Sequence, residues 1–483
     1  MYKAYVTILT NVRKHPNADR LLLADVFGNT VCVSTDYTEN QLGVYFPTDG
    51  QLSVEFAEKN NLVRKKDDAG NNIGGYMDPD KRNVTAIRLR GEKSDGLFLP
   101  ISCLNYCYGH GDASIELRAG DVIDGLVNGH EICCKYIPRS NARRGTVTEG
   151  NRTRKKKVAT APLFKEHADT EQLAYNLGAF KPGDLVEITL KMHGTSQRTG
   201  FLPVLMGYND SPWCGLRNAW KTFIYDTFGK MFKMEEPYEE HDGDPVYDYG
   251  YVSGTRRTVL EDYAGGYYGS NEFREQHSKV FEGKLWKGET VYYEVVGFTT
   301  TGAPIMGDAS NKKLNDKEFV KQYGETTRFS YGCSPDGTKR MYGEDDQGRY
   351  MIDVAVPQSD IYVYRMTMTN PDGEVVEYTP DFMRYRCEQM AVKTVPVFWT
   401  GFIDPGVEDA GEIVRQLAEQ HYDGPDPVGK THVREGVVVR IINRPKFAAY
   451  KHKNFSFKVL EGIAKVDAEA PDMEEAQEVE SDG

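Results

Sequence analysis

The sequence predicts an α+β protein in which a small N-terminal β-barrel precedes a larger module of strands and helices. Short runs of alternating apolar and polar residues, separated by Gly and Asn, fill the first part of the chain. Similar runs return after residue 181, and the segment Trp213–Phe232 has helical spacing instead. The 483 residues are enough for two or three domains.

Residues 1–138 form the first predicted domain. We expect strands at Tyr5–Leu9, Val31–Val33, Val84–Arg90 and Leu97–Leu99, with turns between them at Gly and Asn. Many short strands with little helix are typical of a small barrel.

Residues 139–160 are polar and basic and offer few apolar anchors, so we interpret them as a linker or a loop that grips a nucleic-acid strand. Each Lys or Arg contact to a phosphate releases counterions and strengthens binding to a polyanion. A solvated tether is the alternative. The candidate nucleic-acid-binding residues are Arg143, Arg144, Arg154, Lys155 and Lys156.

Residues 161–463 form the second predicted domain. A turn at Lys181–Asp184 leads into a strand at Leu185–Leu190, and later strands are expected at Val291–Val296, Ile361–Met366 and Gly436–Ile442.

A helix is predicted inside an insertion at Asn209–Tyr251 to which the sequence assigns no role. Its apolar positions fall roughly on one face, and they are Leu216, Trp220, Phe223, Ile224 and Phe228. Residues 464–483 form an acidic tail without a periodic apolar face, and we expect it to be disordered.

Composition favours a soluble intracellular protein that we expect in the cytoplasm as a monomer, without a membrane partner. No apolar run approaches the roughly 20 residues that span a bilayer, and the N-terminus lacks a secretory signal. The net charge of -13 does not exclude nucleic acid, because one basic surface suffices for binding. The residues leave a viral, phage or cellular source open.

The 8 cysteines are scattered, as in a protein without a disulfide framework. A zinc site at Cys103, Cys107, Cys133 and Cys134 is disfavoured, because adjacent cysteines are poorly spaced as ligands. We expect buried, reduced thiols instead.

The segment Lys191–Ser196, with the sequence KMHGTS, follows a predicted strand and is the strongest candidate for chemistry. A lysine held at a strand end can face a pocket, and the small residues after it let phosphates approach. Nearby cations or burial lower a lysine's pKa and favour the neutral, nucleophilic amine. An exposed strand end followed by a turn is the alternative.

Further segments follow Lys191 in a fixed order. They are Ser253–Arg257 (SGTRR), Tyr292–Glu294 (YYE), Tyr362–Arg365 (YVYR), Arg434–Val439 (REGVVV) and Phe457–Val459 (FKV). This series resembles the motifs of the covalent nucleotidyltransferase superfamily of polynucleotide ligases and capping enzymes. His193, where DNA ligases and capping enzymes typically carry Asp, makes it similar to the RNA ligase branch. The resemblance runs from Phe164 to Leu460 and includes Phe164, His167, Asp169 and Thr170 upstream of the lysine.

The resemblance implies a ligase domain of antiparallel sheets and helices, like an ATP-grasp fold, and a role for each landmark. Lys191 attacks the α-phosphorus of ATP; Lys458 contacts the α-phosphate; Arg256 contacts the nucleotide or the incoming 5′-phosphate. Glu294 binds the ribose, Tyr364 stacks on adenine and Gly194 belongs to the nucleotide site. Glu435 helps bind Mg²⁺ or Mn²⁺, and His193 acts when AMP moves to RNA.

The last motif often reads Lys-x-Lys in relatives, whereas Ser456-Phe457-Lys458 supplies one lysine. Either Lys451 or Lys453 supplies the second charge, or none is needed.

The N-terminal segments His15–Leu21, Arg88–Gly91 and Ser94–Leu97 resemble the OB-like domain of Deinococcus-type RNA ligases. Such barrels bind nucleic acid or only support the catalytic domain.

The resemblance implies an ATP-dependent RNA ligase that joins 3′-hydroxyl and 5′-phosphate ends through a lysyl-AMP intermediate and an adenylylated 5′-phosphate end. We expect its substrate to be RNA or a nicked RNA-containing duplex. The alternatives are a DNA ligase, a GTP-dependent capping enzyme using the same lysine, or an inactive RNA-binding relic.

Overall fold

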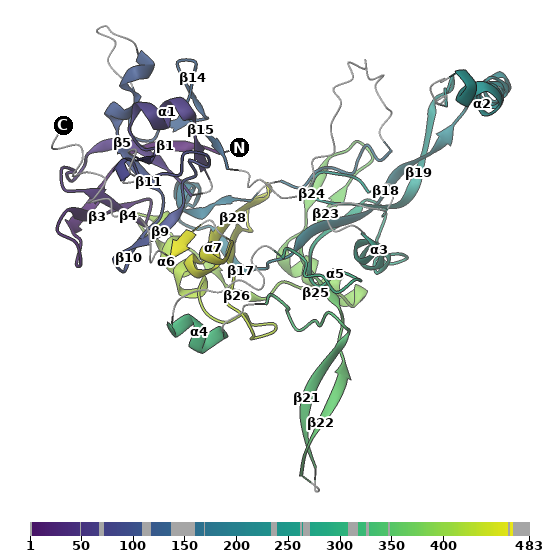
Figure 1. The fold of residues 1–483 in the computed structure, drawn as a ribbon. Coiled ribbons are helices and arrows are strands. Elements are labelled where there is room, and N and C mark those ends of the chain that lie inside the picture. Colours follow the sequence, from purple (N-terminus) through teal and green to yellow (C-terminus); the bar gives the residue numbers. More distant parts are fainter. Residues whose placement is uncertain are drawn as a thin grey trace.

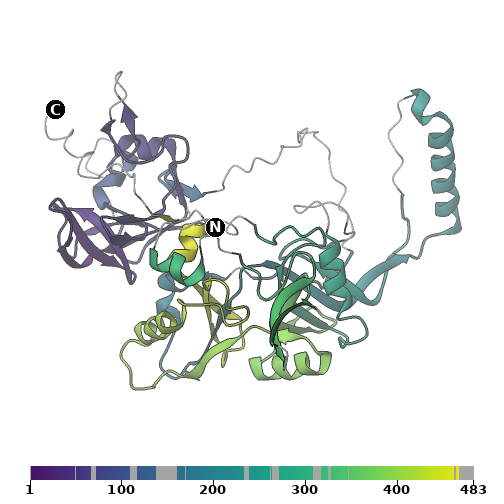
Figure 2. The same ribbon diagram turned by 60° about the horizontal axis from the view of Figure 1, so that its bottom comes forward.

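A computed structural model shows two modules side by side, with two long projections extending from the second (Figures 1 and 2). The residues it describes are 2–48, 50–66, 72–108, 117–136, 160–168, 170–232, 239–260, 263, 271–307, 317–324, 328–345, 348–461 and 464–466. Across these ranges no helix has the length and apolar character needed to cross a membrane.

The N-terminal module is built from several small sheets. A four-stranded antiparallel sheet has the order β11 (Leu97–Pro100), β5 (Leu42–Phe46), β1 (Ala4–Ile8) and β12 (Val122–Ile123). A three-stranded sheet has the order β2 (Thr10–Lys14), β3 (Leu21–Val26) and β4 (Asn29–Ser34). The shorter pairings join β6 (Gly50–Leu52) to β15 (Cys133–Lys135), β13 (Leu126–Val127) to β14 (His130–Glu131), β7 (Lys65–Lys66) to β8 (Asn72–Gly74), and β9 (Ala86–Leu89) to β10 (Glu92–Ser94).

The predicted N-terminal strands are confirmed, but in the described part of this module they do not close into the predicted barrel. One face of the four-stranded sheet is instead covered by α1 (Val54–Lys59) and the 3₁₀ helix η1 (Ile101–Tyr108). Phe56 of α1 and Leu104 of η1 pack with Val44 and Phe46 in the main core. Because helices cover that face, the sheet buries its apolar side without curling onto itself.

The second module contains two sheets whose outer faces carry helices. The first has the order β16 (Glu171–Gln172), β28 (Ala448–Lys453), β27 (Gly436–Ile441), β17 (Leu185–Lys191) and β26 (Val397–Phe402). Helix α6 (Ala410–His421) packs on it, with Val414 and Ala418 against Ile188 and Val439.

The second sheet has the order β19 (Pro245–Gly254), β18 (Thr195–Tyr208), β20 (Glu289–Gly297), β23 (Ser359–Thr369) and β24 (Val375–Glu377). Strand β25 (Lys393–Thr394) pairs with β23. Helices α3 (Glu272–Lys279) and α5 (Pro380–Met390) pack against this sheet through Phe273, Met383 and Cys387. Smaller elements of the module are η2 (Leu173–Tyr175), η3 (Leu177–Ala179), α4 (Lys317–Tyr323) and α7 (Phe455–Glu461).

The two modules are joined by contacts of the C-terminal segment. Strand β29 (Ala464–Val466) pairs with β9 of the N-terminal module, and Phe455 of α7 packs on Ala86. Tyr175 stacks on Tyr5, with ring centroids 4.7 Å apart. The acidic tail was expected to be disordered from residue 464, but its first three residues form β29, because backbone pairing does not need an apolar face. Residues 467–483 lie outside the described residues.

Two projections leave the second sheet in different directions (Figure 1). One is the hairpin of β21 (Thr338–Asp345) and β22 (Gly348–Ala355). The other is the extended β18–β19 pair, which carries helix α2 (Pro212–Phe232) at its tip. The predicted helix is therefore confirmed.

The cysteines follow the prediction of buried thiols except at Cys134, which is exposed, and all 8 are free. Cys103, Cys107 and Cys133 lie in the main core of the N-terminal module. Cys134 follows Cys133 on strand β15 and so points to its opposite face, away from that core.

Candidate active site at the junction of two sheets

Lys191 lies where the first sheet passes into the second. It is the last residue of β17, and Met192, His193 and Gly194 lead directly into β18 of the other sheet. Along β17, Val186, Ile188 and Leu190 are buried. Since neighbouring side chains on a strand alternate, Lys191 points to the opposite face of the sheet from Leu190.

Glu435 is the nearest partner of Lys191. The Lys191 Nζ lies 2.5 Å from the Glu435 Oε1, and Lys453 Nζ lies 3.4 Å from the same oxygen. Burial raises the pKa of the Glu435 carboxyl, but Lys191, Lys453 and His193 outweigh it and hold the pKa below its ordinary value. Glu435 is therefore an anion in a cationic surrounding.

The register of three strands brings these groups together. Lys191 of β17 is opposite Gly436 of β27, and Gly436 is opposite Lys453 of β28. Gly436 has φ +148, and a Cβ there would lie 2.0 Å from the backbone oxygen of His452. Glycine therefore permits the close strand pairing that places Lys453 beside Lys191.

His193 is buried and positioned by its backbone and its ring. Its backbone N–H donates to the Tyr331 hydroxyl at 2.6 Å, and its Nε2 lies 3.1 Å from the Met306 carbonyl oxygen. Phe329 and Phe457 pack edge-on against the ring, with centroids 4.9 and 4.8 Å away. The Nδ1 faces the Glu435 Oε2 at 3.6 Å.

Glu294 belongs to the second sheet and lies in the same electrostatic environment. Burial raises the pKa of its carboxyl to about 7; the nearby Lys191 lowers it, Glu435 raises it, and Arg256 and His193 lower it. Gly194 is packed against β20, because a Cβ there would lie 2.3 Å from the Val295 backbone oxygen and 2.9 Å from Glu294 Cγ. The two sheets thus meet at a position that accepts glycine only.

Tyr364 lies on the same sheet face as Ser196. Their hydroxyl oxygens are 2.7 Å apart, and the Tyr364 ring lies 5.4 Å from the ring of His167. Arg256 follows β19, where its carbonyl accepts the backbone N–H of His167 at 3.0 Å, and its charge lowers the pKa of Glu294. The structure therefore brings together six residues predicted from the sequence: Lys191, His193, Glu294, Glu435, Arg256 and Tyr364.

Lys458 is placed elsewhere, contrary to the expectation that it contacts the α-phosphate. Its Nζ lies 2.6 Å from Asp95 Oδ2 of the N-terminal module. It also lowers the pKa of His452, which is below that of an ordinary histidine mainly because of burial. Side chains alternate along β28, so His452, whose pKa Lys458 lowers, and Lys453, which lies beside Glu435, point to opposite faces of the sheet.

Lys451 and Lys453 lie on β28 near Lys191 and Glu435. Burial lowers the pKa of Lys451 to about 8, and the charges of Lys191, Lys453, Lys135 and Arg256 lower it further. Their i, i+2 spacing on a strand is the signal in the sequence that identifies them, since it puts both side chains on one face.

Arg198 is a site residue that the sequence analysis missed. It is 1% exposed and lies on β18 two residues after Ser196, hence on the same face. Its Nε and Nη1 have no hydrogen-bond partner among the described residues, although its guanidinium lies 4.2 Å from the Phe164 ring centroid. A buried guanidinium with open donors favours an anionic or oxygen-rich ligand.

The donor set suits a hard divalent cation. Glu435 Oε2 is buried and has no hydrogen-bond partner in the described part of the chain, so it can accept a metal ion or a metal-bound water. Glu294 offers a second carboxylate nearby. Oxygen ligands and retained water are what Mg²⁺ and Mn²⁺ prefer. The predicted nucleic-acid-binding residues Arg143, Arg144, Arg154, Lys155 and Lys156 lie outside the described residues.

The chain is similar in structure to solved RNA ligases. Naegleria gruberi RNA ligase with pyrophosphate aligns with a TM-score of 0.50 at 14% identity, over 94% of this chain and 97% of that one. Two mutants of that enzyme, each with ATP and Mn, align with TM-scores of 0.50 and 0.51 at 14% and 13% identity. These alignments cover 96% and 95% of this chain, and 98% and 99% of the other. No protein-family model and no curated protein sequence matches the chain. The likeness shows that the two proteins share a fold.

Proposed function

We propose that this protein is an ATP-dependent RNA ligase that joins 3′-hydroxyl and 5′-phosphate ends through a lysyl-AMP intermediate. The observation that carries the proposal is the cluster at the junction of the sheets. A strand-end lysine, Lys191, lies within reach of Lys453 and Glu435, and Glu294 and Arg256 are near. The fold shared with the Naegleria ligase, whose mutants were solved with ATP and Mn, supports it.

In the first step, the lone pair of Lys191 Nζ attacks the α-phosphorus of ATP. Glu435 holds the Lys191 ammonium in an ion pair, so the pair must open and the ammonium must lose a proton to solvent before the amine can attack. In the attack a P–N bond forms, the bond to the pyrophosphate oxygen breaks, and the second proton of the amine also passes to solvent.

The cations of the cluster stabilise the charge that develops on the phosphates. Lys451 and Lys453 share the face of β28 that is turned toward Lys191, and we assign to them the phosphate contact expected of Lys458. Arg198 and Arg256 are the further candidates for nucleotide contacts, and Tyr364 is placed to pack against the base.

Glu435, with Glu294, would hold Mg²⁺ or Mn²⁺, which when bound screens the phosphate charge. In this chain Glu435 would then exchange its ion pair with Lys191 for the cation. His193 keeps its ring fixed beside Glu435 and is assigned to the second step, in which AMP passes from Lys191 to a 5′-phosphate.

In the third step a terminal 3′-hydroxyl attacks the adenylylated 5′-phosphate and AMP leaves. We propose a nicked duplex with RNA on the 3′-hydroxyl side as the substrate, and the N-terminal module, with residues 139–160, as a nucleic-acid-binding region. The direct contact between that module and α7 supports a joint role.

The test is sealing of a nicked duplex that carries a labelled 5′-phosphate, with ATP and Mg²⁺. We expect a longer labelled product when the 3′-hydroxyl strand is RNA and much less when it is DNA. Equal sealing of an all-DNA nick identifies a DNA ligase. Transfer of GMP to a 5′-diphosphate end identifies a capping enzyme, and binding without any transfer identifies a relic.

A further inference from the structure

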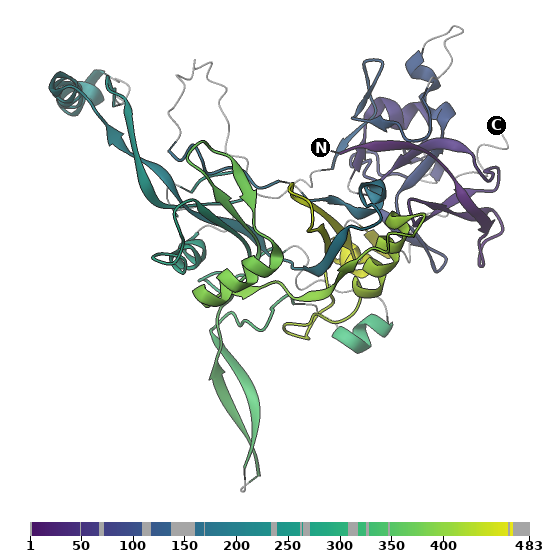
Figure 3. The same cartoon turned by 180° about the vertical axis from the view of Figure 1, so that it is seen from behind.

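Helix α2 lies at the tip of the β18–β19 arm (Figure 3). It exposes a row of large apolar side chains to solvent. Trp213, Leu216, Trp220 and Phe223 are 78%, 63%, 64% and 58% exposed. Leu216, Trp220 and Phe223 were expected on one helical face, and a helix of a globular protein normally buries such a face. Contiguous apolar surface of this kind marks an interaction site.

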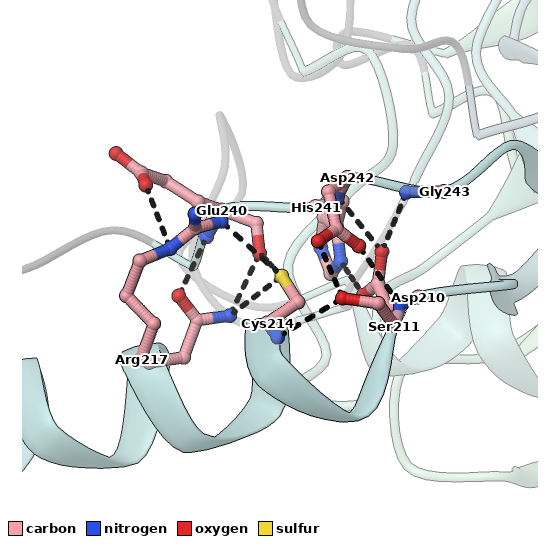
Figure 4. A network of polar contacts seen from close by, with 9 residues as sticks. Asp210, Ser211, Cys214, Arg217, Glu240, His241, Asp242 and Gly243 are labelled. Atoms are coloured by element: carbon pink, nitrogen blue, oxygen red, sulfur yellow. Dashed lines mark hydrogen bonds and ion pairs between the residues drawn. The ribbon is translucent and has the colours of Figure 1, made fainter.

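The arm holds α2 firmly through its other face (Figure 4). Asp210 Oδ1 accepts the backbone N–H groups of Asp242 and Gly243, both at 3.0 Å, and His241 Nδ1 lies 2.7 Å from Asp210 Oδ2. Asn218 Nδ2 donates to the Glu240 carbonyl at 2.7 Å. The exposed row is therefore presented by an anchored helix.

The same hydrogen-bond network argues against a cation site at the base of α2, where the helix joins the β18–β19 arm. Asp210, Cys214 and Asp242 place their ligand atoms within 4.8 Å of one another. However, both oxygens of Asp242 already accept from Ser211, and Cys214 Sγ lies 2.9 Å from the Glu240 carbonyl oxygen. Hydrogen bonding between the two ends of the insertion accounts for the cluster.

The exposed row is suited to another helix rather than to a polyanion. Two cations near it, Arg217 and Lys221, both lie beside Glu240, at 3.5 and 2.8 Å, so this carboxylate offsets part of their charge. The steps of three, four and three residues from Trp213 to Phe223 are the a/d spacing of a helix-pairing seam.

The order of the row is symmetric about residue 218. In an antiparallel pair of α2 helices related by a two-fold axis, Trp213 meets Phe223 of the other copy and Leu216 meets Trp220. Each contact occurs twice, which is the property of a self-complementary two-fold interface. A second copy of this chain can therefore cover all four exposed apolar side chains with the same four side chains of its own α2.

We propose that α2 is a dimerisation helix that pairs antiparallel with α2 of a second copy of this chain. The four side chains expose about 500 Å² per chain if each large apolar side chain offers about 200 Å². This is somewhat below the roughly 800 Å² per partner of a standard stable interface, so the dimer dissociates on dilution. The inference replaces the expectation of a monomer and is independent of the ligase proposal.

The experiment is sedimentation velocity of the full chain over a range of micromolar concentrations. We expect the wild type to shift from monomer to dimer as concentration rises, and Trp220→Glu to stay monomeric throughout. Tyr342→Glu, which changes a 77% exposed tyrosine on the other projection, is the matched control and should dimerise like the wild type.

A charge pair tests the register. Leu216→Glu alone should be monomeric, whereas Leu216→Glu with Trp220→Lys should regain part of the dimer, because each Glu then faces a Lys. Both variants should keep the circular dichroism spectrum and the cooperative thermal unfolding of the wild type, which shows that the chain is folded. A wild type that is monomeric at every concentration, or dimerisation that Trp220→Glu leaves unchanged, overturns the proposal. The proposal is also overturned if the chain stays monomeric and single-stranded RNA protects the fluorescence of the α2 tryptophans from a soluble quencher.

Discussion

Lys191 Nζ lies 2.5 Å from Glu435 Oε1, so the proposed nucleophile rests in an ion pair with the proposed metal ligand. A paired ammonium has no lone pair for attack, and the ion pair keeps the ammonium in place. The second oxygen of the same carboxylate has no hydrogen-bond partner among the residues that the structure describes. Binding of a cation by Glu435 and release of Lys191 are therefore expected to be one event.

Glu435→Gln tests this relationship. The amide keeps the shape of the side chain but neither pairs with the ammonium nor binds Mg²⁺ well, so lysyl-AMP formation should fall by about 100-fold or more. The measurement is the initial rate of protein labelling from α-labelled ATP as a function of Mg²⁺. An unchanged rate and Mg²⁺ dependence would show that Glu435 acts only in folding.

Lys453→Ala and Lys458→Ala compare the lysine of β28 that lies beside Glu435 with the lysine of α7 that pairs with Asp95. Removing Lys453 should slow lysyl-AMP formation by about 100-fold, because its charge lies beside Lys191 and stabilises the developing negative charge. Lys458→Ala should label at close to the wild-type rate. The reverse result would place the phosphate contact at Lys458 instead.

The ion pair between Lys458 and Asp95 should contribute to docking of the two modules. Both side chains are 15% exposed, and their charged atoms lie 2.6 Å apart. A double-mutant cycle with Lys458→Ala and Asp95→Ala should give a coupling energy of about 1 to 3 kcal/mol in urea unfolding. A coupling near zero would mean that β29 and Phe455 suffice for docking.

Arg198→Met should separate stability from nucleotide binding. Methionine fills much of the same volume without a buried charge, so the free energy of unfolding should stay equal or rise. ATP should then raise the melting temperature less than it does in the wild type, with a larger KM in labelling. A destabilised variant with normal ATP affinity would make Arg198 a structural residue only.

Glu294→Gln should show a pH-dependent gain in stability. The pKa of Glu294 rises from its ordinary 4.5 to about 7 on folding, so the folded wild type loses stability as the pH rises through that window. At pH 8 the variant should be more stable by up to about 3 kcal/mol, and at pH 4 the gain should vanish. Urea unfolding at the two pH values measures this. A pH-independent difference would contradict the pKa.

The sequence predicted strands and the ordered motifs well, because period-two alternation and short polar motifs are local. Lys191 and Glu294 lie in buried strands and Glu435 directly precedes one, and the pattern of these strands is visible in the residues. The position of Lys458 could not be predicted, because it lies on helix α7 and its Nζ pairs with Asp95 of the distant N-terminal module. Strand register, which is set by long-range pairing, instead brings Lys453 to Lys191 through Gly436. Arg198 lies in an alternating strand like many others. What marks it is burial of its Nε and Nη1 without a hydrogen-bond partner in the described part of the chain.

The exposure of α2 was likewise not readable from its sequence. An apolar helical stripe predicts burial, and only the arm that lifts the helix away from the sheets decides otherwise. The N-terminal barrel was predicted from many short strands and from the resemblance to an OB-like domain, and the covering helices α1 and η1 were not recognised.

The most direct test of the account is incubation of the full chain, stripped of bound AMP, with α-labelled ATP and Mg²⁺, followed by a denaturing gel. The account predicts an acid-labile label on the wild type and on Lys458→Ala, and none on Lys191→Ala. A label that persists in Lys191→Ala, or a folded wild type that takes no label from ATP, would contradict it.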